Sequence, residues 1–346
     1  MKRFFKRVRT LSTRIDIAVR KRVIRLGGLS SALYYRLVSP RFSHEFRTMG
    51  AGLVEYDRHT HGAKDVYHLR RNVHMLEKGL IMKPRRETFA ERYIEETVAL
   101  FFTVSRAGVL AVDEMTWAHH VLDEYFDATK NSQSNAIRSS ASKWDEAGID
   151  RPAARTHGPS IRSVPDVDLP SIDSLTALAH ARRSVRWFTN QPVPREIVDR
   201  AIEVGMESPT ACNRQPYRFL IIEDPDKVRR VAEIPMGTAG FSHQIPALIA
   251  VIGDYSAFFD ERDRHLIYID SSLAAAPLLL ALQSQGVASC AINWPDLPDR
   301  ERAMRKELGL PHHEQVVMLI AYGFEDTSER APFSAKKSVD HAREYA

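Results

Sequence analysis

Apolar residues recur every three or four positions in several stretches of the first 130 residues, which is the spacing of an amphipathic helix. Three of these stretches cover residues 66–80, 93–105 and 115–126, and Gly108 separates the last two. An earlier stretch runs through Phe4, Val8, Leu11, Ile15, Val19, Val23 and Leu26. We therefore predict a basic amphipathic segment over residues 1–28 and a helical N-terminal region over residues 29–130.

Residues 131–170 differ in composition from the segments on either side. Ser and Asn are frequent there, and prolines stand at positions 152, 159, 165 and 170. Such a segment buries too little apolar surface to offset the entropy of ordering the chain. We predict a linker over residues 131–170, with one short helix near Trp144.

Helical and strand patterns are interspersed from residue 171 to residue 346. Helices are predicted over residues 172–182, after Pro194, and over residues 263–285 and 298–308. Strands are predicted over residues 218–222, 247–253, 287–292 and 315–322. The run 247–253 is apolar throughout, as expected of a buried strand. Because the order is not a strict strand–helix–strand repeat, we favour an α+β fold for residues 171–346.

The charge of the chain is distributed unevenly. The formal net charge is +5, but residues 1–28 contain ten Lys or Arg and a single acid, Asp16. The remaining residues therefore sum to −4, which argues against a nucleic-acid partner. Three interpretations of the basic segment stay open: a helix with a solvated face, a helix lying on an anionic membrane surface, or an organelle transit peptide.

Sequence features also bear on the compartment. No uninterrupted apolar run after the basic residues has the form of a secretory signal, and none elsewhere is long enough to span a bilayer. Residues 273–282 come closest, but Pro277 within them indicates a buried core helix. Cys212 and Cys290 are too few for a disulfide framework and fit a reducing compartment. We expect a cytoplasmic protein, with peripheral membrane contact through residues 1–28 as an alternative.

Familiar nucleotide and metal signatures are missing from the sequence. No G-x-G-x-x-G follows a predicted strand, and no Walker A sequence occurs. Close histidine pairs stand at positions 59 and 61, 119 and 120, and 312 and 313. Because no third ligand is identifiable for any of these pairs, we predict no metal site.

Four short segments contain residues suited to binding a phosphorylated heterocycle. Residues 182–186, Arg-Arg-Ser-Val-Arg, combine guanidiniums with a hydroxyl, which can hold a phosphate. Residues 208–219, S-P-T-A-C-N-R-Q-P-Y-R-F, offer two amides to the edge of a ring. Residues 286–295 read as a strand ending in a proline turn, and residues 334–338 are a basic tail. Each segment alone is also typical of ordinary loops, strands and surface charge.

In this order and spacing the four segments resemble the nitroreductase family over residues 172–340. The segment 208–219 is close to the family pattern S-P-S-x-x-N-x-Q-P-W-x-F, and the opening R-R-S-x-R is also specific. The resemblance implies a nitroreductase-like α+β fold, in which a central mixed, mainly antiparallel sheet is flanked by helices. It further implies that residues 171–346 bind FMN.

The resemblance places ten residues around FMN. Those expected at the phosphate are Arg182, Arg183, Ser184 and Arg186, with Lys336 and Lys337 from the tail. Those expected at the isoalloxazine are Asn213, Gln215, Asn293 and Trp294, the last two at a strand end facing flavin N5. Trp294 stands where many members have Gly, so we expect it to crowd the flavin face, whereas Tyr217 in place of the usual Trp is a mild change.

The function implied by the resemblance is that of an FMN-dependent NAD(P)H:acceptor oxidoreductase. FMN would lie non-covalently at a homodimer interface, take hydride at N5 from reduced nicotinamide, and pass electrons to a small-molecule acceptor in the same pocket. No catalytic side chain is required by this scheme. Two alternatives stay open: a flavin reductase or dehydrogenase acting on a polysaccharide-pathway intermediate, and a catalytically silent flavin-fold binding protein, which Trp294 favours.

Residues 70–86 form a dense polar patch in the helical N-terminal region. The patch resembles a segment found upstream of nitroreductase domains encoded near polysaccharide-synthesis genes. His74, Glu77 and Lys78 are spaced to share one helix face. They form either an exposed ion-pair cluster, a contact with the C-terminal domain, or a lid over the flavin pocket.

Overall fold

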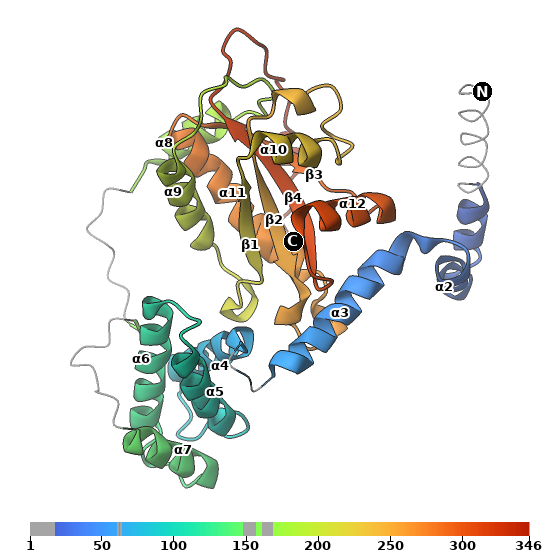
Figure 1. The fold of residues 1–346 in the computed structure, drawn as a ribbon. Coiled ribbons are helices and arrows are strands. Elements are labelled where there is room, and N and C mark those ends of the chain that lie inside the picture. The colour runs from blue at the N-terminus through green and yellow to red at the C-terminus, as the bar shows by residue number, and fades with distance from the viewer. Residues whose placement is uncertain (1–17, 61, 63, 148–156, 161–168, 346) are drawn as a thin grey trace.

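The computed structural model describes residues 18–60, 62, 64–147, 157–160 and 169–345. Within these ranges the chain forms an N-terminal helical region and a C-terminal α+β unit (Figure 1). Most of the predicted amphipathic segment, residues 1–17, lies outside the described residues, while residues 18–25 are helical. Contact of this segment with a membrane therefore stays a prediction.

The N-terminal region consists of helices joined by short loops. They are α2 (Gly28–Leu37), the short η1 (Pro40–Phe42), α3 (Ser43–His59), α4 (Val66–Leu80), α5 (Ile94–Ala107), α6 (Val112–Ala128) and α7 (Asn135–Glu146). Helices α4, α5 and α6 fall where the apolar spacing predicts them. Gly108 adopts a left-handed φ of 62° at the end of α5, a conformation that glycine reaches without steric cost.

Helices α4 to α7 enclose one hydrophobic core. Trp144 of α7 is only 3% exposed, and its indole Nε1 donates a hydrogen bond of 2.9 Å to Asp123 Oδ1 on α6. Ile137 of α7 is buried in the same core. The short helix predicted near Trp144, within the proposed linker over residues 131–170, is α7, and Ile137 and Trp144 give it an apolar face of its own.

The C-terminal unit is built on one four-stranded sheet. The strands are β1 (Tyr217–Ile222), β2 (Ala247–Asp254), β3 (Ala288–Asn293) and β4 (Glu314–Gly323), in the order β1-β2-β4-β3. All neighbouring strands pair antiparallel, and Ser184 adds an isolated parallel bridge to Ser289 of β3. The predicted nitroreductase-like α+β fold with a mainly antiparallel sheet is confirmed.

Helices cover both faces of this sheet, so the unit has three layers (Figure 1). Side chains alternate between the faces of a strand, and in β2 Leu248, Ala250 and Ile252 pack toward α10 (Pro225–Ala232) and α12 (Pro298–Leu308). Ile249 and Val251 pack toward α9 (Arg195–Met206) and α11 (Leu266–Ser284) on the opposite face. Both faces of β2 are therefore buried, which accounts for its uninterrupted apolar sequence.

Helices α3 and α4 both join the N-terminal region to the C-terminal unit. Helix α3 packs on residues 255–257, and a Cβ added to Gly52 of α3 would lie 2.4 Å from Tyr255 Cβ. The Tyr67 hydroxyl of α4 donates a hydrogen bond of 3.0 Å to Asp254 Oδ2 at the end of β2. The helical region is therefore packed directly against one end of the sheet.

Close packing of α9 on α11 generates a prediction for stability. A Cβ at Gly205 of α9 would lie 2.8 Å from the Ala274 carbonyl oxygen and 3.2 Å from Leu278 Cβ. Gly205→Ala should therefore force the helices apart and lower the free energy of unfolding by about 1–3 kcal/mol, measured by urea denaturation. Gly50→Ala in α3 is the matched control, because nothing lies within 4 Å of its added Cβ. It should raise stability by up to about 1 kcal/mol, and equal effects of the two changes would contradict this account.

Candidate functional site

The Arg-Arg-Ser-x-Arg segment lies beside the edge strand β3. Helix α8 (Ile172–Ala181) ends just before it, and the Val185 amide donates a hydrogen bond of 3.1 Å to the Ser289 carbonyl. Val185 is 3% exposed and points into the core. In an extended segment its neighbours Ser184 and Arg186 then face the other way, and both are half-exposed.

This segment concentrates positive charge without a carboxylate partner. Within the part of the chain that the structure describes, no ion pair links Arg182, Arg183 or Arg186 to an acid. Burial raises the pKa of the Cys290 thiol on β3, while the positive charges of Arg186 and Arg182 act in the opposite direction. Three guanidiniums and a hydroxyl within five residues, with no carboxylate partner among the described residues, suit a bound phosphate.

The amide-bearing loop, residues 208–216, is anchored on α11. Ser208 Oγ donates to the Leu273 carbonyl at 3.0 Å, and the Ala211 amide donates to Asp270 Oδ2 at 3.1 Å. Asp270 is 2% exposed and is the only charged residue of α11. Motif reasoning missed it, although a lone carboxylate in an otherwise apolar helix was a signal available in the sequence.

Backbone strain marks the same loop. Cys212, Asn213 and Gln215 have left-handed φ values of 55°, 53° and 53°. Each costs about 1–2 kcal/mol for a residue with a Cβ, and such strain collects at functional sites. The loop holds Asn213 and Gln215 together, because Gln215 Nε2 donates to Asn213 Oδ1 at 3.2 Å.

A single chain does not bring the cationic segment, residues 182–186, and the amide loop together. Ser184 forms an isolated β-bridge with Ser289 of β3. Ser289 pairs with Tyr322 of β4, and Tyr322 in turn pairs with Ala247 at the start of β2. The amide loop instead leads into Tyr217, which pairs with Gly253 at the far end of β2. Ala247 and Gly253 are six residues apart, or about 20 Å along the strand. Arg182 and Ser184 thus lie at one end of the sheet, and Asn213 and Gln215 at the other.

The end of β3 requires a correction to the expectation for Trp294. Cys290, Ile292 and Trp294 pack into the same core. Trp294 is 8% exposed, and its indole Nε1 donates a hydrogen bond to Glu301 Oε1. Asn293 lies between them in sequence and is exposed. Trp294 therefore does not crowd the exposed face of β3, because strand alternation directs its side chain into the core.

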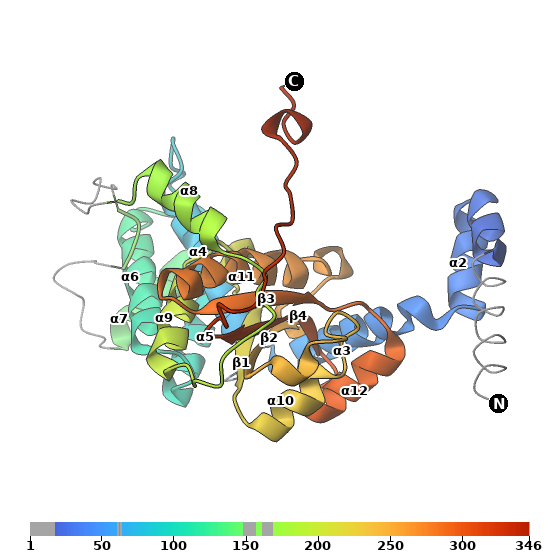
Figure 2. The same cartoon turned by 90° about the horizontal axis from the view of Figure 1, so that it is seen from above.

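Lys336 and Lys337 lie on a C-terminal tail that leaves the body of the molecule (Figure 2). Both are exposed, and no hydrogen bond or ion pair joins either to another described residue. The start of the tail does reach the cationic segment, because Arg183 Nη1 donates a hydrogen bond to the Phe333 carbonyl at 3.1 Å. The structure thus places the tail near Arg183 but does not bring the two lysines to Ser184.

The polar patch of the N-terminal region divides into two parts. Arg70 of α4 contacts the amide loop, donating to the Arg214 carbonyl at 3.5 Å and, through Nε, to Glu114 Oε1 at 2.7 Å. His74 instead pairs with Glu77 at 3.5 Å on the half-exposed side of the helix. One end of the patch is therefore a contact with the C-terminal unit, and the other is a local ion pair.

Comparisons with known proteins agree with this architecture. Residues 179–239 and 233–324 match the model of the Nitroreductase family. The chain is 23% identical to iodotyrosine deiodinase 1 of Pongo abelii, over 62% of this chain and 82% of that protein. It is 29% identical to the NADH dehydrogenase of Thermus thermophilus, over 46% of this chain and 90% of that protein. It is also similar to a putative nitroreductase in complex with FMN from Desulfovibrio desulfuricans, with 21% identity and a TM-score of 0.43 over 50% and 96% of the two chains.

These matches support an oxidoreductase. More narrowly, residues 179–324 match the nitroreductase family.

Asp270 generates a prediction for the amide loop. Asp270→Ala should lower the free energy of unfolding by about 1–3 kcal/mol, because it leaves the Ala211 amide without its acceptor. Asp270→Asn is the matched control, since it keeps a carbonyl oxygen there. Urea denaturation at several pH values measures both effects.

The pH dependence follows from burial, which raises the pKa of Asp270 in the folded protein. The folded state then holds this proton more tightly, so wild-type stability should fall as pH rises from the unfolded-state pKa through the folded one. Asp270→Asn should lack that fall. Equal stability of the Ala and Asn variants at neutral pH would show that Asp270 does not anchor the loop.

Proposed function

We propose that this protein is an FMN-dependent NAD(P)H:acceptor oxidoreductase that works as a homodimer. The observation that carries the proposal is a cationic cluster at the edge of β3, Arg182, Ser184 and Arg186, for which no described residue supplies a carboxylate partner. Such a cluster fits the phosphate of FMN. The match of residues 179–324 to the nitroreductase family supports the same cofactor.

The donor set suits the rest of the cofactor as well. Asn213 and Gln215 offer amide donors and acceptors to the edge of the isoalloxazine ring. The exposed side of β3, at Ala291 and Asn293, offers backbone groups of an edge strand to the ring. Lys336 and Lys337 would add charge at the phosphate once the tail folds back or meets a second chain.

FMN, when bound, supplies the redox chemistry, accepting hydride from NAD(P)H and returning electrons to a small-molecule acceptor. The residues of this chain bind and orient: Arg182, Arg183 and Arg186 neutralise the phosphate, and Asn213 and Gln215 fix the ring edge. Reduced nicotinamide and acceptor would occupy one pocket in turn, so no separate nucleotide-binding domain is needed. No side chain is required to move a proton at a fixed position.

The distance between the two halves of the site supports the homodimer. Register keeps Ser184 and Gln215 at opposite ends of the sheet, so in this proposal a second copy supplies the amide loop that completes each site. Unpartnered apolar surface supports this arrangement. No residue of α8 is buried, and Ile269 and Leu273 of α11 are 51% and 44% exposed.

The catalytically silent alternative depended on Trp294. Because the indole lies in the core and bonds to Glu301, it no longer favours a blocked flavin face. No specific contact in the described part of the chain favours a polysaccharide-pathway substrate.

Subunit complementation tests cofactor and dimer together. Arg182→Gln and Asn213→Ala should each weaken FMN binding roughly ten- to hundredfold, as expected when a hydrogen bond to a buried polar or charged ligand group is lost. Visible absorbance after gel filtration measures retained flavin. Arg195→Gln is the control, because that side chain is 78% exposed and pairs only with Glu223, so flavin should be retained.

Mixed dimers give the decisive result. Co-folding the two variants in equal amounts makes half of the dimers mixed, and each mixed dimer has one intact site if the halves come from different chains. About a quarter of the sites should then bind FMN with wild-type affinity. No recovery would mean that each site lies within one chain, and full retention by both single variants would mean that these residues do not hold FMN.

A further inference from the structure

We propose that His44, Asp296 and Glu301 form a binding site for a divalent cation of the Zn²⁺ class, which fastens helix α3 to the start of helix α12. The three residues come from α3, from the loop between β3 and α12, and from the first turn of α12. This inference is independent of the flavin proposal. The three ligand residues are not assigned to FMN binding, and the only residue shared with that proposal is Trp294, whose indole is buried.

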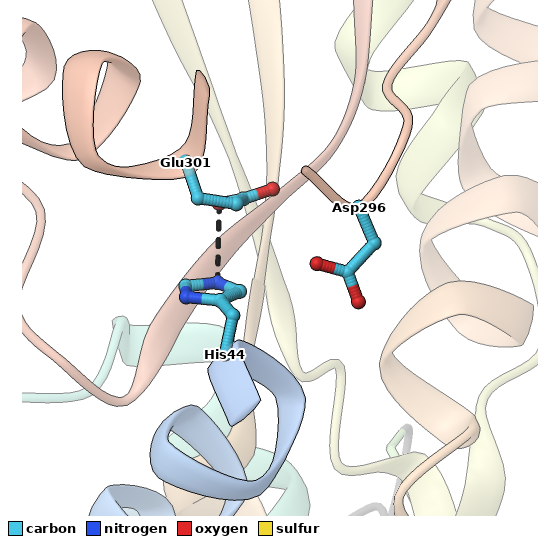
Figure 3. A group of neighbouring side chains, drawn as sticks. All are labelled: His44, Asp296 and Glu301. Atoms are coloured by element: carbon cyan, nitrogen blue, oxygen red, sulfur yellow. Dashed lines mark ion pairs between the residues drawn. The ribbon is translucent and has the colours of Figure 1, made fainter. Parts of the chain in front are cut away.

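The geometry brings three ligand types into one place (Figure 3). His44 Nε2 lies 3.2 Å from Glu301 Oε2, and Asp296 directs its carboxylate toward the same space. One candidate ligand atom from each residue lies within 4.8 Å of the other two. An imidazole nitrogen and two carboxylate oxygens are ligands that Zn²⁺ accepts in proteins.

The buried carboxylate of Glu301 needs a positive partner. His44 is 8% exposed and Glu301 is 3% exposed. Within the described residues, neither Glu301 nor Asp296 forms an ion pair with Lys or Arg. Nearby Arg305 donates instead to the backbone carbonyls of Pro311 and Glu314. A protonated imidazole would balance the buried Glu301 carboxylate alone, whereas a divalent cation would balance Glu301 and also attract the exposed carboxylate of Asp296.

The ligands are also held in place by neighbouring groups. Trp294 Nε1 donates to Glu301 Oε1, which leaves the other oxygen, Oε2, directed at His44. Partners of this kind orient metal-binding carboxylates and strengthen metal affinity. Trp294, which departs from the family pattern, is thus a positioning residue for Glu301.

The spacing requires one adjustment on binding. Four ligands about 2.1 Å from Zn²⁺ in a tetrahedron lie about 3.5 Å from one another. The His44–Glu301 pair already meets this value, while the 4.8 Å limit of the group exceeds it. Asp296 is exposed, so rotation of its side chain can close the difference and leave the fourth position to water.

Isothermal titration of metal-stripped full-length protein with Zn²⁺ tests the proposal. Wild type should bind one Zn²⁺ per chain at this site, and Asp296→Asn and Glu301→Gln should each weaken binding at least tenfold. Asp299→Asn is the matched control, because its side chain is 90% exposed and lies near the same loop, so it should bind like wild type. Asp296→Asn changes an exposed residue, so loss of the fold does not confuse its result.

A second readout follows from the position of the site between two elements. Zn²⁺ should raise the thermal unfolding midpoint of wild type and of Asp299→Asn, but not that of Asp296→Asn. All variants should retain flavin equally, which separates this proposal from the FMN site. Failure of folded wild type to bind Zn²⁺, or equal affinity in wild type and Asp296→Asn, would overturn it and leave His44 and Glu301 as a buried ion pair.

Discussion

The register of the sheet is the constraint on which the account of this protein depends. The register of the sheet places Ser184, at the β3 edge, level with the start of β2 and places Tyr217 beside the end of β2. The cationic segment and the amide loop therefore cannot meet within one chain. The exposed helix α8 and the exposed apolar side of α11 fit the proposed homodimer, in which a second copy would cover them. The register of one buried strand thus sets the distance on which the proposed homodimer rests.

The N-terminal region acts on the same end of the sheet as the amide loop. Arg70 holds the loop from one side through the Arg214 carbonyl, while Asp270 of α11 holds it from the other through the Ala211 amide. Further along the junction, Gly52 lets α3 approach Tyr255 closely. The helical region therefore contributes to the geometry of the loop that carries Asn213 and Gln215, although it supplies none of the groups expected to touch FMN.

Local patterns predicted most of the fold, because apolar periodicity reports which face of each element is buried. All four strands and helices α4, α5, α6, α9, α11 and α12 lie close to their predicted ranges. The orientation of Trp294 was misjudged, although alternation from Cys290 and Ile292 would have placed it in the core. The contacts of Arg70 with Arg214, and of His44 with Glu301, could not be predicted from the sequence. Each joins residues far apart in the chain, and no motif connects them.

The central claim is that residues 171–346 hold a working flavin, and the visible spectrum tests it most directly. Purified protein should show the absorbance of oxidised flavin, and NADH or NADPH added without oxygen should bleach it. A colourless protein that also fails to take up added FMN would contradict the assignment of Arg182 and Ser184 to the phosphate. Bound flavin that neither nucleotide reduces would keep the fold and remove the proposed oxidoreductase activity.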